Sequence, residues 1–292
     1  MKDMSLLNNN FPWLVFNLNK SFFALSCENI TSIAILPKGI TKPVLTPPYI
    51  RGLLDMRGEF IPLLDMRNLF GFPTLGSEFD NFKEAKAAAV GAHQAWVDEL
   101  TRSVEKGGIF TGELDPTKCT FGKWLATFNS CNNVINSHLR KINVPHRELH
   151  QAGTKIVELQ KQSQSAERSK NIMECLEKVT QISAPAVFST LVKIEEDWLE
   201  AHREMVIIFT YGDKKIGLIV DEVQSVEKLE ILNQEVSRDM QGIAHFFTSI
   251  ARSTKSDKII ILINETQLGI LFSESDFNFD QDALTELAEV EA

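Results

Sequence analysis

The sequence lacks any long apolar run. Its longest, Ile259–Ile263, is far short of the ~20 residues that a helix needs to cross a bilayer, which argues against a membrane-spanning segment. The start, MKDMSLLNNNFPW, has no basic region followed by an apolar stretch, so no signal peptide is expected. An excess of positive charge is lacking too. The net charge of -9 argues against broad binding to the phosphate backbone of nucleic acids.

Cysteine is scarce as well. The four residues, Cys27, Cys119, Cys131 and Cys175, show no paired spacing, which in a cytoplasmic chain favours free thiols or a metal ligand over disulfides. We therefore expect a cytoplasmic protein in which Cys27, Cys131 and Cys175 are core thiols. What is present, 292 residues with 43% hydrophobic and 24% charged side chains, is typical of a globular protein and allows two cores of ~150 residues each.

Both ends of the chain predict strands and turns. Residues 13–26 predict two apolar strands with a turn at Asn19-Lys20, residues 28–36 a short helix or turn, and residues 49–71 a hairpin that turns at Arg57-Gly58. A shift of 193 positions (14 to 207) lays Leu14-Val15-Phe16 on Ile207-Ile208-Phe209 and Asn19-Lys20 on Gly212-Asp213. Such a repeat indicates two similar β subdomains, each a closed or partly closed barrel. The alternative is chance similarity between amphipathic hairpins.

Between these ends the apolar spacing becomes helical. Ala88, Ala92, Ala95, Trp96 and Leu100 follow one face of a helix that ends at Lys106-Gly107-Gly108. Further helices are expected over residues 117–128, 132–141, 146–162 (with Pro145 at its first turn), 165–183 and 185–202. Helices of this length joined by short loops form a bundle. We therefore predict an all-α domain over residues 77–203, inserted between two halves of a β domain, residues 1–76 and 204–292.

Four residues of the helical region are candidate metal ligands. His146 and His150 are one helical turn apart, so both imidazoles project from the same face. His93 lies in mid-helix with Trp96 at i+3, and Cys119 lies in the first turn of a short helix, where the helix N-terminus favours a thiolate. Three imidazoles and one thiolate suit zinc better than magnesium or calcium.

The residues alone leave other interpretations open. Two histidines at this spacing are common on solvated helix faces, and a lone cysteine is usually a small core residue. His138 is a competing ligand, whereas His202 and His245 fit surface or packing roles. A zinc hydrolase needs an open coordination position and a general base. Arg147 stands where an HExxH protease has its base, and Glu148 points to another face, so we expect no enzyme.

The same residues resemble the chemoreceptor zinc-binding (CZB) family. The resemblance spans about residues 85–200 and rests on His93…Trp96, on Cys119-Thr120-Phe121-Gly122-Lys123-Trp124-Leu125, and on Pro145-His146…His150. The middle segment matches the family's Cys-x-[Leu/Phe]-Gly-x-Trp signature. The resemblance implies a four-helix bundle with a three-His, one-Cys zinc site, whose ligands here would be His93, Cys119, His146 and His150.

The outer halves resemble CheW, which links chemoreceptors to the histidine kinase of bacterial chemotaxis. The matching stretches are Leu14-Val15-Phe16, Pro48-Tyr49-Ile50-Arg51-Gly52, Met56-Arg57-Gly58, Ile61-Pro62-Leu63-Leu64-Asp65, Gly217–Val223 and Ile259–Asn264. The resemblance implies two five-stranded barrels that act by docking, with Arg57 in the place of a receptor-docking arginine. Phe246–Ile250, where the family commonly has Tyr-x-x-Gly, and the charged loop Arg252–Lys258 depart from the family pattern.

Together these features predict an α+β multidomain protein, a CheW-like double β-barrel interrupted by an all-α CZB-like four-helix bundle. We expect a cytoplasmic scaffold that couples a chemoreceptor signalling tip to a CheA-like histidine kinase, while its zinc-binding bundle senses zinc, or oxidant through the Cys119 thiolate. The alternatives are a purely structural zinc in a bundle used for dimerisation, and a zinc-dependent hydrolase. An apolar stripe, Leu176, Val179, Phe188, Leu191 and Ile194, fits a core better than a dimer face, although a homodimer is compatible with the sequence.

Overall fold

A computed structural model of the chain describes residues 11–42, 46–130, 132–232 and 242–274. The chain divides into two compact units. The β unit combines residues 1–74 with residues 203–292, and the helical unit is residues 75–202. No helix in the described ranges is long and apolar enough to span a membrane.

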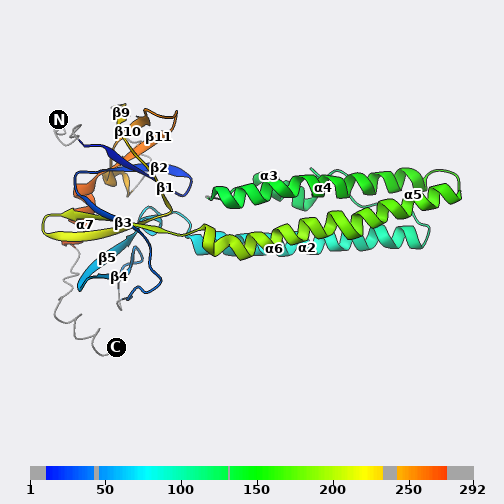
Figure 1. Cartoon of the computed structure of the whole chain (residues 1–292), viewed down its shortest axis with the longest axis horizontal. Helices are drawn as coiled ribbons and strands as arrows, with labels where there is room; N and C mark the ends of the chain where they lie inside the picture. Colours follow the sequence, from blue (N-terminus) through cyan, green and yellow to red (C-terminus); the bar gives the residue numbers. More distant parts are fainter. Residues whose placement is uncertain (1–10, 43–45, 131, 233–241, 275–292) are drawn as a thin grey trace. The chain divides into compact units, whose positions relative to one another are not determined.

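Among the described residues, the β unit contains eleven strands, five before the helical unit and six after it. The first half, blue to cyan in Figure 1, holds β1 (Trp13–Leu18), β2 (Ser21–Ser26), β3 (Ile30–Ile35), β4 (Ile50–Met56), β5 (Glu59–Asp65) and the short α1 (Met66–Leu69). The second half holds β6 (Met205–Tyr211), β7 (Lys214–Val220), β8 (Glu222–Glu227), β9 (Leu229–Ile231), the 3-10 turn η3 (Ala244–Phe246), β10 (Phe247–Ser253), β11 (Ile259–Ile263) and α7 (Glu265–Glu274).

The strand order confirms the internal repeat and adds an exchange of strands between the halves. One sheet has the order β8-β1-β2-β11-β10-β9 and the other β3-β6-β7-β5-β4. Read from β8 and from β3, the first five strands of the two sheets correspond in order. The shift of 193 positions relates β1, β2 and β3 to β6, β7 and β8, whereas a larger shift relates β4 and β5 to β10 and β11. However, each sheet mixes the two halves, because β1 and β2 of the first half lie between β8 and β11, and β6 and β7 of the second half lie between β3 and β5. Neither half therefore completes a sheet alone.

Two hairpins turn where the sequence predicts. The β1–β2 connection is the two-residue loop Asn19-Lys20, with φ of 49° and 69°, and the β4–β5 connection is Arg57-Gly58, with φ of 59° and 83°. Positive φ at both central positions defines the type I′ turn, whose twist matches that of the flanking strands. Arg57 is thus a turn residue, exposed at a hairpin tip, and the Asp55 carboxylate accepts a hydrogen bond from Gly58 N at 2.8 Å.

The expectation of a short helix or turn over residues 28–36 is wrong, because Ile30–Ile35 form the edge strand β3. Its side chains alternate between half-buried and exposed, and Ile33 and Ile35 lie on the exposed face. Apolar residues on both faces hide the period-two alternation by which a strand is recognised. Only the pairing of β3 with β6, far along the chain, makes the segment a strand.

The core of the β unit has a shared centre. One cluster of buried residues draws on both halves, with Leu14, Phe16 and Phe23 packed together with Ile207 and Phe209. Each sheet has a further cluster of its own on the opposite face of its strands. The alternation of side chains along a strand places successive residues in these different clusters.

Two arginines, one buried and one partly exposed, form ion pairs within the β unit. Arg67, which is 2% exposed, binds Asp221 with two hydrogen bonds, Nε to Oδ1 at 2.6 Å and Nη2 to Oδ2 at 2.7 Å. Arg51 donates from Nε to Asp65 Oδ2 at 2.9 Å and from Nη1 to Glu204 Oε2 at 3.2 Å. Both pairs join segments that are distant in sequence.

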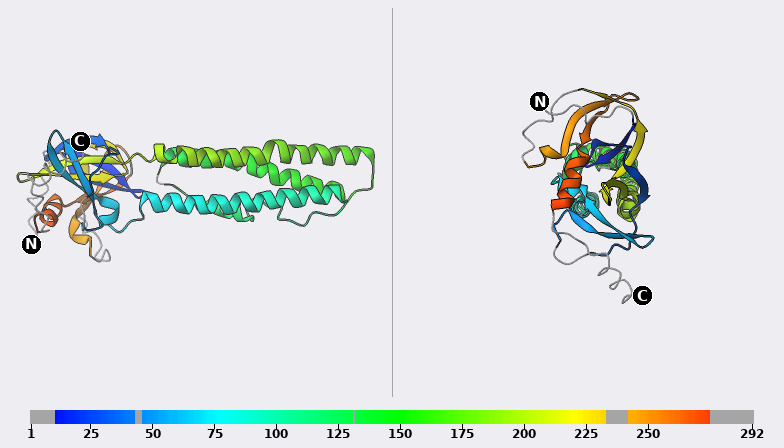
Figure 2. Two further views of the ribbon diagram at one scale, coloured as in Figure 1. Left: turned by 90° about the horizontal axis from the view of Figure 1, so that it is seen from below. Right: turned by 90° about the vertical axis from the view of Figure 1, so that its left-hand side faces the viewer.

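The helical unit is built from long helices that lie alongside one another in both views of Figures 1 and 2. They are α2 (Leu75–Glu105), the short α3 (Thr120–Thr127), α4 (Asn133–Gln160) and a continuous run made of α5 (Ala166–Glu177), the π-helical turn η2 (Lys178–Ser183) and α6 (Ala184–Ala201). α4 packs along this whole run, while α2 packs against α3 and α6. Within the described part of the chain, two apolar clusters follow one another along these helices.

One expected helix boundary is wrong, because Pro145 lies inside α4 and does not begin a new helix. The boundary expected near Pro185 is confirmed, since Pro185 lies in the first turn of α6, although α6 continues from η2 without a loop. A proline within a helix removes one hydrogen bond and costs about 3 kcal/mol. In α4 the carbonyl that loses its partner belongs to Lys141, which is exposed, and the buried face runs on through Ile142, His146 and Leu149. Burial on both sides of the proline maintains one helix.

The buried face of α2 also differs from the expected one. Ala88, Ala92 and Ala95 are exposed, and the buried residues are instead Phe82, Ala89, His93, Val97 and Leu100. Burial free energy scales with apolar area, so the larger side chains determine which face of a helix turns inward. The rotation places His93 in the middle of the buried stripe. The tail of the bundle agrees with the core interpretation, because Leu176, Val179, Leu191 and Ile194 are buried.

Candidate metal centre

Three helices of the helical unit bring His93, Cys119, His146 and His150 together. One possible ligand atom from each lies within 4.8 Å of the others. His93 Nε2 is 3.2 Å from His146 Nε2, and Cys119 Sγ is 3.3 Å from His146 Nε2 and 3.8 Å from His93 Nε2. The three histidines are buried and Cys119 is half-buried. The spacing of His146 and His150 on α4 gives the convergence that the sequence indicates.

Cys119 caps a helix and is not part of its first turn. It is the N-cap of α3 with an extended backbone, and its sulfur accepts a hydrogen bond from Gly122 N at 3.1 Å. A Cβ on Gly122 would lie 1.8 Å from the Pro116 carbonyl oxygen and 3.3 Å from the Cys119 sulfur. Glycine is therefore required where the cap, the sulfur and the preceding loop approach one another. This is the physical basis of the Cys-x-Phe-Gly segment.

The histidine rings are held by neighbours outside the cluster. His93 Nδ1 donates to the Ala89 carbonyl at 3.1 Å, which leaves its Nε2 as the lone-pair nitrogen that faces the cluster. His150 packs against Trp96, with ring centroids 5.1 Å apart. Trp96 in turn donates from Nε1 to the Glu113 carbonyl at 2.8 Å. No sequence pattern points to Glu113, because it contributes its backbone carbonyl, which every residue type has.

Burial keeps the histidines neutral. Desolvation, followed by repulsion from His150 and His93, lowers the pKa of His146 to about 3. Desolvation and then His93 lower the pKa of His150 to about 4, and desolvation also lowers that of His93. The nearby Glu113 carbonyl acts in the opposite direction on the pKa of His150, but burial outweighs it. Neutral imidazole is the form that binds a metal.

The expectation that a helix N-terminus makes Cys119 a thiolate is wrong for the metal-free protein. Burial raises the pKa of its thiol, and the negative charges of Glu113 and Asp115 add to this effect. The amide hydrogen bonds from Gly122 and Phe121 lower the pKa but do not compensate. The thiol lies 3.4 Å from the Pro116 carbonyl, to which it can donate. A bound cation is what would stabilise the thiolate here.

The residues fit a zinc ion. Zn–N bonds of about 2.0–2.1 Å and Zn–S bonds of about 2.3 Å place the donors of a tetrahedral site roughly 3.3–3.6 Å apart. The separations of 3.2, 3.3 and 3.8 Å among His93, Cys119 and His146 are close to this range, and all four donors lie within 4.8 Å of one another. Neither ring nitrogen of the fully buried His150 has a hydrogen-bond partner among the described residues. Buried polar atoms without partners are rare and indicate a missing water or ion. Three nitrogens and one sulfur form a donor set that zinc prefers.

The other candidate residues lie elsewhere. His138 forms a pair with Asp197 (Nε2–Oδ2 3.5 Å) and is not in the cluster. His202 stacks on Trp198 at 4.5 Å, and His245 is exposed beside Phe246, in agreement with packing and surface roles.

The remaining thiols and carboxylate are also accounted for. Cys27 and Cys175 are half-buried against apolar clusters, and Cys131 falls outside the described residues. The Glu148 carboxylate lies 3.7 Å from Lys178 Nζ, so its partner is on η2 and not in the cluster. Arg57 lies in the β unit.

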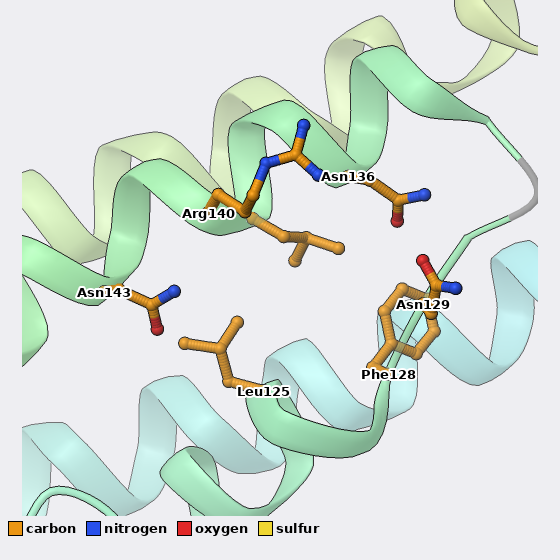
Figure 3. A pocket seen from close by; sticks show the side chains of 7 residues that line it. Leu125, Phe128, Asn129, Asn136, Arg140 and Asn143 are labelled. Carbon is orange, nitrogen blue, oxygen red and sulfur yellow. The ribbon is translucent and has the colours of Figure 1, made fainter.

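A shallow pocket in the helical unit does not include the cluster. It has a volume of about 100 Å³ and lies between α3 and α4 (Figure 3). Its lining residues are Leu125, Phe128, Asn129, Asn136, Leu139, Arg140 and Asn143. The Asn136 amide is already engaged with the Ser130 backbone, at 2.8 Å and 2.9 Å. The pocket is therefore separate from the four candidate metal ligands.

The stability of the metal-free protein is expected to fall in acid. His146 and His150 have a folded-state pKa of about 3 and about 4, below the value of ~6.5 in an unfolded chain. The unfolded state thus binds more protons, and each histidine costs about 1.4 kcal/mol per pH unit below ~6.5, until the folded-state pKa is reached. Melting with chelator at pH 7, 6 and 5, followed by circular dichroism at 222 nm, measures this slope. An equal slope in a variant lacking both histidines would contradict the assignment.

Two stretches of the chain match known family models. Residues 93–157 match the family model of the chemoreceptor zinc-binding domain, and residues 12–88 match that of the CheW-like domain. The second half of the β unit has no match of its own among these. No curated protein matches the chain. Neither matched family is a family of enzymes.

Two solved structures are similar to the chain. The scaffolding protein TtCheW from Thermoanaerobacter tengcongensis has 15% identity and a TM-score of 0.37 over 87% of this chain and 88% of that one. The regulatory CZB domain of DgcZ has 17% identity and a TM-score of 0.32 over 41% of this chain and 98% of that one. Both likenesses are too distant to support an argument about individual residues.

Proposed function

We propose that the protein is a non-enzymatic scaffold of chemotaxis-type signalling, in which a zinc-binding helical unit adjusts the docking of a CheW-like β unit. The observation that carries the proposal is the convergence of His93, Cys119, His146 and His150 within a region that matches a zinc-binding family. The CheW-like match supports a partner role between a chemoreceptor and a CheA-type histidine kinase, in the cytoplasm where such kinases act.

The domain organisation belongs to the proposal. We take residues 1–76 and 204–292 as the two halves of one CheW-like double barrel, and residues 77–203 as an inserted four-helix CZB bundle. The strand exchange supports this arrangement, because β3 of the first half pairs with β6 of the second. A surface loop whose ends are close tolerates an insertion, since loop closure costs little more for a longer loop.

The proposed ligands are His93, Cys119, His146 and His150. A zinc ion would supply charge that stabilises the Cys119 thiolate and links the helices that carry its ligands. The protein contributes orientation, because Ala89 fixes the tautomer of His93 and Gly122 N–H steadies the sulfur. Burial contributes selectivity for neutral nitrogen and sulfur ligands over carboxylates.

Two stimuli fit this site. Zinc occupancy itself would be a signal, because binding at such a site is coupled to folding. An oxidant would act on Cys119, which is half-buried whereas the three histidines are buried, and which as a sulfenate would be a poorer ligand. A purely structural zinc in a dimerising bundle is the competing proposal. It predicts occupancy that never changes under cellular zinc levels.

Arg57 is the proposed docking residue of the β unit. It is exposed on the type I′ turn between β4 and β5, where the side chain extends from a rigid hairpin tip. Replacing it by glutamate is expected to weaken receptor-dependent kinase activation about tenfold, because reversing a charge at an interface costs on the order of 1.4 kcal/mol or more. The measurement is kinase activity in a reconstituted assembly of receptor, kinase and this protein.

The control is Arg252→Glu, which reverses an exposed arginine on the equivalent hairpin, β10–β11, of the other half. Equal losses in both variants would indicate a general charge effect and remove Arg57 from the proposal. The same assembly tests sensing, with zinc-loaded, chelated and oxidant-treated protein compared in the parent and in Cys119→Ser. Kinase output that is unchanged by chelator would reject regulation by zinc. An oxidant response that survives Cys119→Ser would reject the redox route.

A further inference from the structure

The α5–η2–α6 run buries one stripe of side chains, and a single member of that stripe is polar. The hydroxyl-bearing residue is Ser183, which is fully buried, and its oxygen has no hydrogen-bond partner among the described residues. Within those residues, His150 is the other side chain with unpaired buried polar atoms. The apolar members of the stripe are Ile172, Leu176, Val179, Ala184, Val187, Leu191, Ile194 and Trp198.

The π-helical turn explains why this hydroxyl is unpaired. Serine and threonine within a helix usually bond to the carbonyl four residues back, as Thr180 does to Leu176 at 3.0 Å. The corresponding carbonyl for Ser183 is that of Val179, which instead accepts from Ala184 N across the wider turn. π-helical turns are rare in proteins, and those that occur are frequently found at functional sites. Here the π-helical turn leaves the Ser183 hydroxyl free to form a hydrogen bond with a side chain of another helix.

Ser183 occupies the same layer of the helical unit as the metal centre. For each of Ser183, His146 and His93, the buried residue about one turn before it and the one about one turn after it belong to different apolar clusters. These flanking pairs are Val179 and Val187, Leu149 and Ile142, and Val97 and Ala89. α4, which carries His146, packs directly against η2. A layer of polar side chains therefore separates the two apolar clusters, and the α5–η2–α6 run contributes Ser183 to this layer.

His93 and His150 each have a backbone carbonyl near the ring, although only His93 is hydrogen-bonded to it, whereas His146 has none among the described residues. His93 donates from Nδ1 to the Ala89 carbonyl, and His150 lies beside the Glu113 carbonyl. His146 presents Nε2 to the cluster, and within the described chain its Nδ1 forms no hydrogen bond. When Nε2 of a neutral imidazole is a metal ligand, the proton is on Nδ1, and such ligands almost always donate it to a fixed acceptor.

We propose that Ser183 is a positioning residue of the metal centre, whose hydroxyl accepts a hydrogen bond from His146 Nδ1 in the metal-bound protein. This inference rests on the zinc site of the proposed function. It explains why a hydroxyl is buried in an otherwise apolar stripe and why the helix widens at this point. In the metal-free protein His146 Nε2 is shared with its neighbours, and the hydroxyl stays unpaired.

The test is Ser183→Ala, with zinc affinity measured by chelator competition and melting measured separately without metal. Zinc affinity is expected to fall about 10–100-fold, the usual effect of losing an outer partner of a ligand. The Tm of the metal-free variant is expected to rise, because an unpaired buried hydroxyl is removed. Opposite signs in the two measurements distinguish positioning of a ligand from a general role in packing.

A spectroscopic readout and a matched control complete the experiment. In zinc-loaded protein with labelled histidine, the Nδ1 proton of His146 is expected to exchange slowly in the parent and fast in Ser183→Ala. Thr180→Val removes a hydroxyl from the same turn that is already bonded within the helix, and should change neither zinc affinity nor exchange. If the parent binds zinc and Ser183→Ala behaves like Thr180→Val, the inference is overturned. If the parent binds no zinc, the proposed function itself fails first.

Discussion

Purified under reducing conditions without chelator, the parent protein is expected to contain about one zinc per chain, and His150→Ala none. His150 is fully buried with both ring nitrogens unpaired, so its removal deletes a donor that the fold cannot replace. Metal that binds only the folded state stabilises it by RT ln(1 + [L]/Kd), about 4 kcal/mol at a thousandfold excess over Kd. The parent should gain this stability on adding zinc, and the variant should gain almost none.

Elemental analysis and thermal melting with and without zinc measure both effects. His138→Ala is the matched control, because His138 lies on the same helix but pairs with Asp197 and stands outside the cluster. It should retain the metal and its stabilising effect. A parent without zinc would show that the four-residue site is wrong, whatever the β unit does. Full occupancy in His150→Ala would remove that residue from the ligand set.

Replacing Arg67 by methionine is expected to destabilise the β unit by about 3–5 kcal/mol. The substitution leaves the Asp221 carboxylate, 10% exposed, without the two guanidinium hydrogen bonds that offset its burial. It also removes the donor to the Pro73 carbonyl. Because small domains have total stabilities of about 5–15 kcal/mol, a loss of this size should be visible as a large drop in the denaturant midpoint.

The double variant Arg67→Met/Asp221→Leu separates loss of a pair from exposure of an unpaired charge. If the cost comes from the unpaired carboxylate, the double variant should regain most of the stability. A surface pair such as Lys170–Glu174, with side chains 75% and 61% exposed, should contribute less than about 1 kcal/mol when Lys170 is replaced. Equal losses at the buried and the exposed pair would contradict the argument from burial.

The sequence predicted local features well where one side chain or one turn decides the structure. The turns at Asn19-Lys20 and Arg57-Gly58 are visible because short polar loops between apolar runs have few conformations. The convergence of His146 and His150 follows from helix geometry alone. His93 and Cys119 are different, because nothing in their spacing fixes a contact. Their residue types make them candidates, and the resemblance to a zinc-binding family is what joins them to the histidine pair.

The features that were missed depend on partners far along the chain. β3 is a strand only because β6 is beside it, and Pro145 stays inside α4 only because burial continues on both sides of it. The alanines of α2 have helical spacing, yet Phe82 and Val97 turn a different face inward. Pattern gives the period of an element, while the competition between faces and partners is decided by total burial. Ser183 was missed for the same reason, since a lone serine within a helical pattern carries no signal.

The mixing of strands from both halves in each sheet has a consequence for the protein as it leaves the ribosome. The chain is made from its N-terminus, and domains generally fold as units in the order of synthesis. β3 must wait for β6, which begins at Met205, whereas the last cluster residue of the helical unit is His150. The nascent chain therefore carries all four candidate ligands while its β sheets still lack the strands of the second half. Under the proposed function, zinc would bind before the β unit can dock on its partners.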